Sequence, residues 1–339
     1  MAEIAEYIKP LLQGQSLTFE QAASLLDRVF DGECPEAQIA AFLTAMQIKG
    51  PAAAELAGLA KSLRSHAVPV KIDIENLVDT CGTGGSAFKT FNISTAAAIV
   101  AAGAGVHVAK HGNRGITSKC GSADVLEELG VRIDASPQTV ADCIKQARIG
   151  FMFAPMFHPA MKYVQPIRKS LGFRTVFNVL GPLANPAGVK RQVLGVADEK
   201  LMPLVAEALK LLGAEYAMVV HAGGMDEIST ITPTKILELE GSRIATRQLD
   251  ARDLGIGPAN LKALQAPDAK TSAELIRNIV SGEEIGPCRD IVVLNAAAAI
   301  ITGGLAKDFA AGMELAQDAI AAGAASESMK KLIEVSNQA

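Results

Sequence analysis

One glycine-rich loop restricts the possible folds of this chain more than any other feature of its sequence. The loop follows the strand-like run Leu77-Val78-Asp79, and residues 82–85 read Gly-Thr-Gly-Gly. Three glycines within four residues allow positive φ angles and let a ligand approach the backbone closely. A polar turn then opens a helix at about Ile93, where free amide groups favour an anion. The segment predicts a phosphate-binding loop in an α/β protein.

The spacing excludes two common types of glycine loop. A dinucleotide-binding loop needs a third glycine at a fixed offset and an acidic residue further on, and neither follows here. A Walker loop ends in Gly-Lys-Ser/Thr, which is also absent. A tight turn between a strand and a capped helix would use the same residue types without any ligand. On this pattern alone, both a phosphate loop and a structural turn remain open.

Composition limits the protein class and its partners. The chain has 339 residues with a formal net charge of −4, and 49% of the residues are hydrophobic. The mild acidity provides no general attraction to nucleic acid or to anionic membranes. The longest apolar stretch, residues 96–109, contains two glycines and is too short to cross a bilayer. We expect no nucleic-acid partner and no membrane partner.

The cysteines and the N-terminus indicate a cytoplasmic location. The five cysteines are scattered and form no Cys-x-x-Cys pair, which favours a reducing compartment over disulfides or a zinc site. Residues 1–6 show neither the basic nor the apolar region of a secretion signal. We therefore expect a cytoplasmic protein.

The chain divides into two regions of different pattern. Residues 1–70 contain only helical periodicity, with a capping box at Thr18 and Gln21, and we expect a small helical domain there. Residues 71–339 alternate strands and helices, which predicts a larger α/β domain with a mainly parallel central sheet flanked by helices. Part of the segment 163–187 is basic and rich in Pro and Gly, and we expect it to join the helical domain.

Several elements of the larger region can be located from the sequence. An antiparallel hairpin is expected at residues 236–239 and 243–249. Ser136 and Pro137 form a cap followed by a first-turn proline, which predicts a helix to Ala147. The remaining expected elements are strands at 106–109, 151–154, 193–196 and 217–220 and helices at 93–104, 122–129, 271–280, 290–302 and 306–322.

A second polar loop, residues 109–122, follows the next strand and precedes a helix. Its fourteen residues include two lysines, one arginine, one histidine and three glycines. Such a loop can supply charge and backbone donors to a polyphosphate, whereas a solvated basic loop is the alternative. Two such loops after neighbouring strands favour the binding interpretation.

Two further blocks carry candidate chemistry. Asp226 and Glu227 follow a strand in a glycine-containing loop, and together with phosphates they could hold Mg²⁺. The block 157–174 contains Arg168, which could form a forked contact with a carboxylate. Surface Asp-Glu pairs are common, however, and the basic residues of 168–174 could instead form an exposed helix face.

Taken together, these four blocks resemble the anthranilate phosphoribosyltransferases, enzymes of the nucleoside-phosphorylase-like phosphoribosyltransferase class. The resemblance rests on Asp79-Thr80-Cys81-Gly82-Thr83-Gly84-Gly85, Asn92-Ile93-Ser94-Thr95, Lys110-His111-Gly112-Asn113-Arg114, the block from His158 to Arg168, Asn178-Val179-Leu180-Gly181-Pro182-Leu183 and Asp226-Glu227. It covers nearly the whole chain. It implies the transfer of phosphoribose from phosphoribosyl pyrophosphate (PRPP) to the amine of anthranilate in tryptophan biosynthesis, with release of pyrophosphate.

The resemblance also implies partners and site residues. It implies a homodimer formed through the helical domains, Mg²⁺ as cofactor, and two small-molecule substrates. The implied PRPP contacts are Gly82, Gly85, Ser86, Thr90, Asn92, Ser94, Thr95, Lys110 and Ser122. The implied anthranilate contacts are Gly82, Asn113, His158, Tyr163, Arg168 and Gly181, and the implied metal ligands are Ser94, Asp226 and Glu227. Because an aryl amine is already neutral, no acid or base is assigned.

One residue departs from the pattern of this family. An acidic residue usually follows the double glycine, and here that position is Ser86. A hydroxyl can donate to a phosphate oxygen but cannot replace a carboxylate as a ligand for a second metal ion. We expect this chain to bind a second Mg²⁺ weakly.

Two other functions would use a similar sequence. A pyrimidine nucleoside phosphorylase would need only inorganic phosphate, which fits the Asp226-Glu227 pair and the 110–114 loop less well. A non-catalytic relative that binds nucleic acid through the basic loops would lack a reason for its acidic balance and its few aromatic residues.

Overall fold

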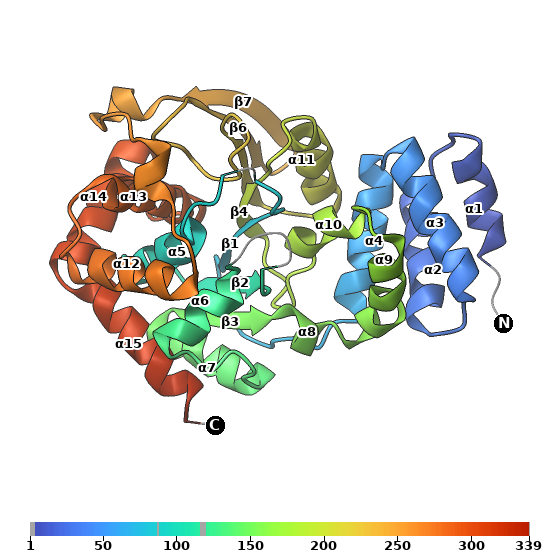
Figure 1. Ribbon diagram of the computed structural model, residues 1–339, viewed down its shortest axis with the longest axis horizontal. Helices are drawn as coiled ribbons and strands as arrows, with labels where there is room; N and C mark the ends of the chain where they lie inside the picture. The colour runs from blue at the N-terminus through green and yellow to red at the C-terminus, as the bar shows by residue number, and fades with distance from the viewer. Residues whose placement is uncertain (1–3, 87, 116–119, 339) are drawn as a thin grey trace.

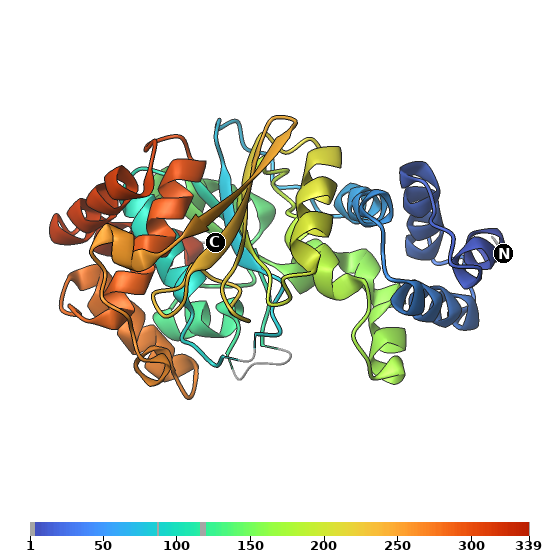
Figure 2. The ribbon, with the colours of Figure 1, turned by 90° about the horizontal axis from the view of Figure 1, so that it is seen from above.

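The structure is a computed structural model that describes residues 4–86, 88–115 and 120–338. It contains a helical part and a larger α/β part, which lie side by side along the longest axis (Figure 1). The helical part carries the N-terminus at one end of the molecule, and the view from above shows the same separation (Figure 2). Within the described residues, no helix is both long and apolar enough to span a membrane.

The helical part is built from four N-terminal helices. Thr18 caps the second helix, where its side chain accepts from the N–H of Gln21 at 3.2 Å and the Gln21 side chain accepts from the N–H of Thr18 at 2.9 Å. This confirms the predicted capping box. The helices are α1 (Ala5–Leu12), α2 (Phe19–Phe30), α3 (Glu36–Lys49) and α4 (Ala53–Ser65).

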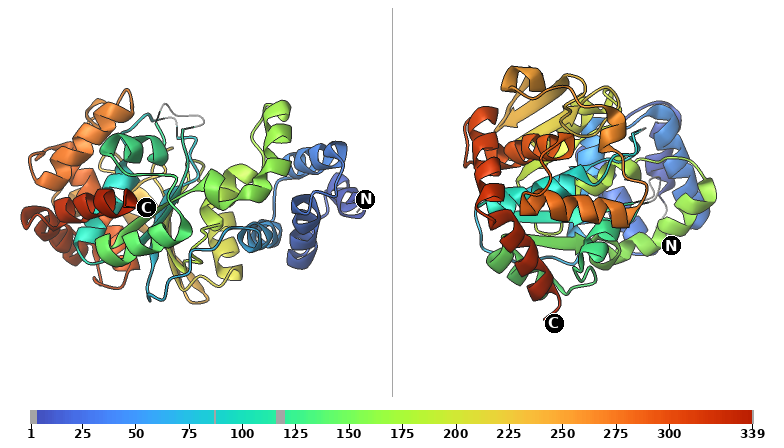
Figure 3. Two further views of the ribbon diagram at one scale, coloured as in Figure 1. Left: turned by 90° about the horizontal axis from the view of Figure 1, so that it is seen from below. Right: turned by 60° about the vertical axis from the view of Figure 1, so that its left-hand side comes forward.

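Part of the later chain packs with these helices. Val164, Ile167 and Phe177 share a core with buried residues of α2, α3 and α4. This segment contains α8 (Ala154–Phe157), α9 (Gln165–Leu171) and α10 (Phe177–Leu180), with short 3₁₀ turns at Pro159–Tyr163 and Gly181–Leu183. In the view from below, α9 lies beside the blue N-terminal helices (Figure 3).

The α/β part is organised around a seven-stranded sheet with the order β3-β2-β1-β4-β5-β6-β7. The first five strands are parallel, and β6 and β7 form the predicted antiparallel hairpin. The strands are β1 (Val78–Gly82), β2 (Val108–Gly112), β3 (Ile149–Phe153), β4 (Arg191–Gly195), β5 (Tyr216–His221), β6 (Thr234–Glu240) and β7 (Arg243–Leu249).

Alternation along the strands directs side chains into two separate cores. Val193 and Met218 belong to the core under α5 and α13, whereas Leu194 and Val219 belong to the core shared with α4 and α11. This division follows from the two-residue repeat of a strand. The flanking helices are α5 (Ile93–Gly103), α6 (Ser122–Leu129), α7 (Pro137–Ala147), α11 (Leu201–Leu211), α12 (Ala269–Ser281), α13 (Pro287–Thr302), α14 (Phe309–Ala321) and α15 (Ala324–Ser336).

The predicted elements agree with the structure apart from a few additions. Ser136 accepts from the N–H of Thr139 at 3.1 Å and begins α7, as expected from the Ser-Pro pair. The sequence patterns did not reveal α1, α11 or α15. The last helix that they predicted, at residues 306–322, is α14. The helix α15 packs on α5 and α7 and belongs to the α/β part.

Candidate active site at the carboxyl ends of β1 and β4

The strand order of the sheet reverses between the neighbouring strands β1 and β4. From β1 the chain adds β2 and β3 on one side, and it then places β4 and β5 on the other. In open α/β sheets, ligands bind in the crevice outside the carboxyl ends of the strands at such a point. Gly82 and Gly195 are register partners and end the two strands there.

The loop with Asp226 and Glu227 occupies this crevice because both strand ends lack side chains. A Cβ atom added to Gly195 would lie 1.7 Å from the backbone oxygen of Asp226, and one added to Gly82 would lie 2.5 Å from Oδ2 of Asp226. The N–H of Gly84 donates to the same Oδ2 at 3.1 Å. The acidic loop and the glycine loop, far apart in sequence, therefore form one wall of the site.

Three ionisable side chains meet in this crevice. Burial, followed by the charge of Asp226, raises the pKa of Glu227 to about 8. Burial also raises the pKa of Asp226. Lys110 on β2 is buried, and its Nζ donates to the carbonyl oxygen of Thr80 at 2.5 Å and lies 3.4 Å from Oγ of Ser94. Burial lowers the pKa of Lys110, while Asp79 opposes that shift.

The chemistry of these side chains fits a hard cation shared with a ligand. Mg²⁺ takes oxygen ligands, usually one or two carboxylates together with waters and substrate phosphates. Asp226, Glu227 and the hydroxyl of Ser94 line one small hollow with Thr80 and Gly195. In the described ranges, no group of three or more His, Cys, Asp or Glu side chains is arranged around a metal position.

The glycine loop has the backbone geometry that its sequence predicts. Gly84 and Gly85 have φ angles of 65° and 83°, which side-chain-bearing residues rarely adopt. The guanidinium group of Arg174 lies directly over Gly85. A Cβ atom added to Gly85 would come within 2.1 Å of its Nη1. Ser86 donates through Oγ to the carbonyl oxygen of Gly224 at 3.2 Å and so joins the glycine loop to the acidic loop.

The start of α5 contains the next predicted residues. Asn92 is the N-cap residue of α5, but its side chain makes no capping hydrogen bond. Ser94 lies in the first turn, and its carbonyl oxygen accepts from Oγ1 of Thr80 at 3.2 Å. Thr95 is fully buried. Thr90 forms an isolated antiparallel bridge with Gln265.

The second polar loop is arranged around the end of β2. Asn113 is exposed, and its carbonyl oxygen accepts from Oγ of Ser122 at 3.4 Å. Arg114 is paired with Asp124 at 3.1 Å and Glu127 at 2.7 Å. Two carboxylates of α6 therefore already neutralise this arginine, whereas Lys110 of the same block has no carboxylate within ion-pair distance among the described residues. Residues 116–119 of this loop lie outside the described residues.

His158 lies against His111, with ring centroids 5.0 Å apart. Burial lowers the pKa of His158 to about 4, and burial together with the nearby His158 lowers the pKa of His111 to about 3. Within the described part of the chain, Nε2 of His111 and both ring nitrogens of His158 have no hydrogen-bond partner. Burial therefore favours the neutral form of both rings, and these nitrogens are enclosed by the surrounding side chains and backbone.

Three further residues that were predicted to contact anthranilate lie in the segment after His158. Gly181 begins a 3₁₀ turn close to His111. Arg168 lies over the ring of Phe177, with Cζ 5.3 Å from the ring centroid, and its Nη1 donates to Gln165 at 3.1 Å. Tyr163 contacts Gly32 and lines a hollow within the helical part.

Sequence reasoning missed two residues of the site. His111 stands within the quoted Lys110–Arg114 block, but no spacing in that block indicated its contact with His158. Arg174 was treated as one of a group of surface charges, although it lies over Gly85 and its charge favours the ionised form of Asp226. No local pattern indicated Arg174, because that contact depends on the packing of the two parts.

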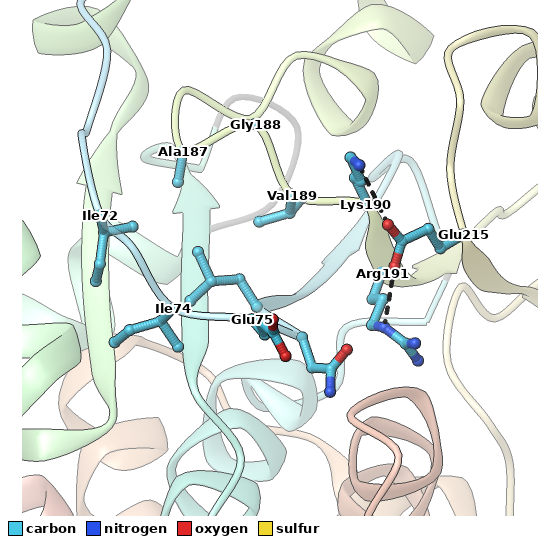
Figure 4. A pocket seen from close by; sticks show the side chains of 11 residues that line it. Ile72, Ile74, Glu75, Ala187, Gly188, Val189, Lys190, Arg191 and Glu215 are labelled. Carbon is cyan, nitrogen blue, oxygen red and sulfur yellow. Dashed lines mark hydrogen bonds and ion pairs between the residues drawn. The ribbon is translucent and has the colours of Figure 1, made fainter.

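A larger hollow of about 410 Å³ lies elsewhere, at the amino ends of β1, β4 and β5 (Figure 4). Three of its charged side chains are paired with one another, with Glu215 between Lys190 at 3.2 Å and Arg191 at 3.6 Å. It contains none of the predicted site residues. Because it lies at the opposite ends of the strands from the crevice, we do not assign the chemistry to it.

Two family descriptions match the chain in its two parts. Residues 74–326 match the description "Glycosyl transferase family, a/b domain", and residues 5–67 match "Glycosyl transferase family, helical bundle domain". An anthranilate phosphoribosyltransferase of Roseiflexus castenholzii is 48% identical over 336 residues, which are 98% of each chain. One of Methanosphaerula palustris is also 48% identical, again over 98% of each chain. The chain belongs to the anthranilate phosphoribosyltransferase family.

Solved structures of anthranilate phosphoribosyltransferases have the same fold. The enzyme of Thermus thermophilus is 38% identical, with a TM-score of 0.92 over 97% of this chain and 98% of that one. The enzyme of Saccharomyces cerevisiae, in complex with PRPP and Mg, is 29% identical, with a TM-score of 0.91 over 99% of this chain and 98% of that one. Both the family predicted from the motifs and the predicted fold class are confirmed.

Proposed function

We propose that the protein transfers the 5-phosphoribosyl group of PRPP to the amine of anthranilate, the reaction of its family. The bond between C1 of the ribose and the pyrophosphate oxygen breaks, and pyrophosphate leaves with the electron pair. A bond forms between C1 and the amine nitrogen, which then loses a proton. The products are N-(5-phosphoribosyl)anthranilate and pyrophosphate.

The observation that carries this proposal is the crevice between β1 and β4. It combines a glycine loop with positive φ angles, two carboxylates and a buried lysine. A bare phosphate does not require two carboxylates, since their charges would repel it. A diphosphate that shares a cation with these carboxylates satisfies both charges.

We assign the PRPP contacts to the glycine loop, the start of α5 and the end of β2. The proposed residues are Gly82, Gly85, Ser86, Thr90, Asn92, Ser94, Thr95, Lys110 and Ser122. Backbone amides and hydroxyls of this set can donate to phosphate oxygens, and Lys110 adds a positive charge. The side chain of Thr95 is fully buried, and its Oγ1 has no hydrogen-bond partner in the described structure. Thr95 would therefore contact PRPP through its backbone, or its side chain would move when PRPP binds.

Ser94, Asp226 and Glu227 are the residues that would hold Mg²⁺. When bound, the cation neutralises charge on the leaving diphosphate. The protein supplies the rest of the stabilisation through Lys110 and the loop amides, which are fixed before the reaction and need no reorganisation. Because burial raises the pKa of Glu227, binding of the cation would be coupled to loss of the proton from its carboxyl group.

For the acceptor, we propose contacts with Gly82, Asn113, His158, Tyr163, Arg168 and Gly181, and we add His111. The rings of His111 and His158, tilted by 57° with centroids 5.0 Å apart, would form an aromatic edge of the site against which an aromatic amine could pack. Arg168 offers a guanidinium group that has no carboxylate partner within the described residues, which suits the carboxylate of anthranilate. Holding both substrates in one orientation supplies much of the remaining acceleration.

The domain boundary, the assembly and the location are part of the same proposal. We place the boundary near residue 70 and assign part of 163–187 to the helical domain. Buried residues of this segment and of the N-terminal helices belong to one core, which supports the assignment.

We propose a homodimer formed through the helical domains. Leu12 at the end of α1 and Ile48 in α3 support it, because they are 70% and 81% exposed. We also propose a cytoplasmic location, to which the five free cysteines correspond.

Anthranilate fluorescence tests the proposed function directly. We expect the signal to fall when the protein, PRPP and Mg²⁺ are combined, with release of one pyrophosphate for each anthranilate consumed. EDTA should stop the loss. Phosphate-dependent cleavage of thymidine or uridine without any loss of anthranilate would instead identify a nucleoside phosphorylase and overturn the proposal.

A further inference from the structure

The backbone and the side chain of Asn92 are both bound by one hydroxyl from the far end of the chain. The N–H of Asn92 donates to Oγ of Ser272 at 3.0 Å, and the same hydroxyl donates to Oδ1 of Asn92 at 2.9 Å. Sγ of Cys120 also donates to this Oδ1 at 2.9 Å. Ser272 is fully buried in the first turns of α12.

The two residues before Asn92 are also bonded to this distant part of the chain. The N–H of Phe91 donates to the carbonyl oxygen of Leu264 at 2.9 Å, and Thr90 pairs with Gln265. Phe91 and Leu264 are both buried in the large core of the α/β part. Residues 264–272 therefore run along Thr90–Asn92 and hold it by backbone as well as side-chain bonds.

This arrangement decides which end of the Asn92 carboxamide is available. Oδ1 accepts two hydrogen bonds, so it is directed towards Ser272 and Cys120. The side chain does not cap α5, and no partner for Nδ2 occurs among the described residues. Asn92 is partly exposed, so the carboxamide presents two N–H donors and no acceptor at the start of α5.

We propose that Ser272 is a positioning residue that orients Asn92 so that its NH₂ group faces the oxygen atoms of PRPP. This inference rests on the proposed function. PRPP carries phosphate and hydroxyl oxygens, and a carboxamide turned the other way would place its own oxygen against them. The hydroxyl of Ser272 disfavours this orientation, because the carboxamide would then lose the hydrogen bond that Oγ of Ser272 donates to Oδ1.

The test is a cycle of Ser272→Ala and Asn92→Ala, with KM measured for both substrates. Loss of one hydrogen bond of this kind corresponds to about a tenfold change, so we expect Ser272→Ala to raise the KM for PRPP about tenfold. The KM for anthranilate should stay within about twofold. In the Asn92→Ala background, Ser272→Ala should add less than about twofold, because residues that act through each other are not additive. Ser281→Ala, on an exposed residue of the same helix, is the control and should match the wild type.

Other results would overturn the inference. Equal increases in both KM values, or the same increase with and without Asn92, would assign Ser272 a structural role only. If Ser272→Ala does not fold, Ser272→Cys keeps nearly the same side-chain size but replaces a strong donor and acceptor with a weak one, so it should still raise only the KM for PRPP. An unchanged value in that variant would also overturn the inference. If the wild-type protein does not consume anthranilate, the proposed function itself is overturned. If Ser272→Ala turns over normally with an unchanged KM for PRPP, only the role of Ser272 is overturned.

Discussion

Gly195 at the end of β4 is in direct contact with the backbone of Asp226, so close that an added Cβ would lie 1.7 Å from the Asp226 carbonyl oxygen. Its register partner Gly82 lies against the carboxylate of the same residue. The acidic loop thus takes its position from the absence of two side chains. The proposed metal site depends on these glycines as much as on its carboxylates.

Substitution of Gly195 by alanine is expected to displace the acidic loop. The new Cβ meets backbone rather than a flexible side chain, so the loop must shift, at a cost of about 1–3 kcal/mol in the free energy of unfolding. We also expect a loss of transferase activity that added Mg²⁺ does not restore. Denaturant unfolding and the Mg²⁺ dependence of the rate check this. Gly257→Ala is the control, because no atom lies within 4 Å of a Cβ there. Normal Mg²⁺ dependence in Gly195→Ala would contradict the assignment.

Arg168→Ala is expected to affect the acceptor more than PRPP. A hydrogen bond to a charged group contributes about 1.5–3 kcal/mol, so the KM for anthranilate should rise roughly tenfold to a hundredfold. The KM for PRPP should change little. Steady-state kinetics with each substrate varied in turn provides the measurement, and Lys169→Ala on the same helix is the matched control. Equal changes in both KM values would place Arg168 outside the acceptor site.

Ser86→Asp tests the departure of this chain from its family. A carboxylate at this position could serve a second metal ion, whereas the hydroxyl of Ser86 bonds to Gly224. We expect the variant to change the dependence of the rate on Mg²⁺ concentration, which a titration from micromolar to tens of millimolar would measure. Ser242→Asp, in the exposed turn between β6 and β7, should behave as the wild type. If the Ser86→Asp titration coincides with that of the wild type, weak binding of a second Mg²⁺ does not follow from Ser86.

The buried ring of His158 is expected to make stability depend on pH in the acid range. Its pKa is lowered from 6.5 to about 4 by burial, so the folded protein binds fewer protons than the unfolded chain between these values. The contribution is fully present above pH 6.5 and is lost as the pH falls towards 4, by about 3 kcal/mol in total. Unfolding free energies of His158→Asn should fall less steeply over this window than those of the wild type. His66→Asn, with a partly buried ring outside the site, is the matched control. Equal slopes for His158→Asn and wild type would show that His158 does not cause the acid sensitivity.

Local sequence patterns predicted most of the elements and the general position of the site. The glycine loop, the Thr18 capping box and the Ser136-Pro137 helix start each depend on residues within a few positions of one another. Such features can be read from spacing because backbone conformation and capping are local. The helix α15 was missed because its apolar residues follow a glycine and lie at the end of an already assigned helical region.

Contacts between distant segments could not be predicted in the same way. Arg114 belongs to a basic loop by sequence, yet Asp124 and Glu127 on α6 bind it. Arg174 lies over Gly85, and Ser272 binds Asn92 across 180 positions of the chain. The motifs along the chain were enough to predict the family, most of the elements and the residue types of the site. Which charges are already paired, and which polar atoms have no partner among the described residues, became clear only in the folded chain, because these properties depend on the packing of segments that are distant in sequence.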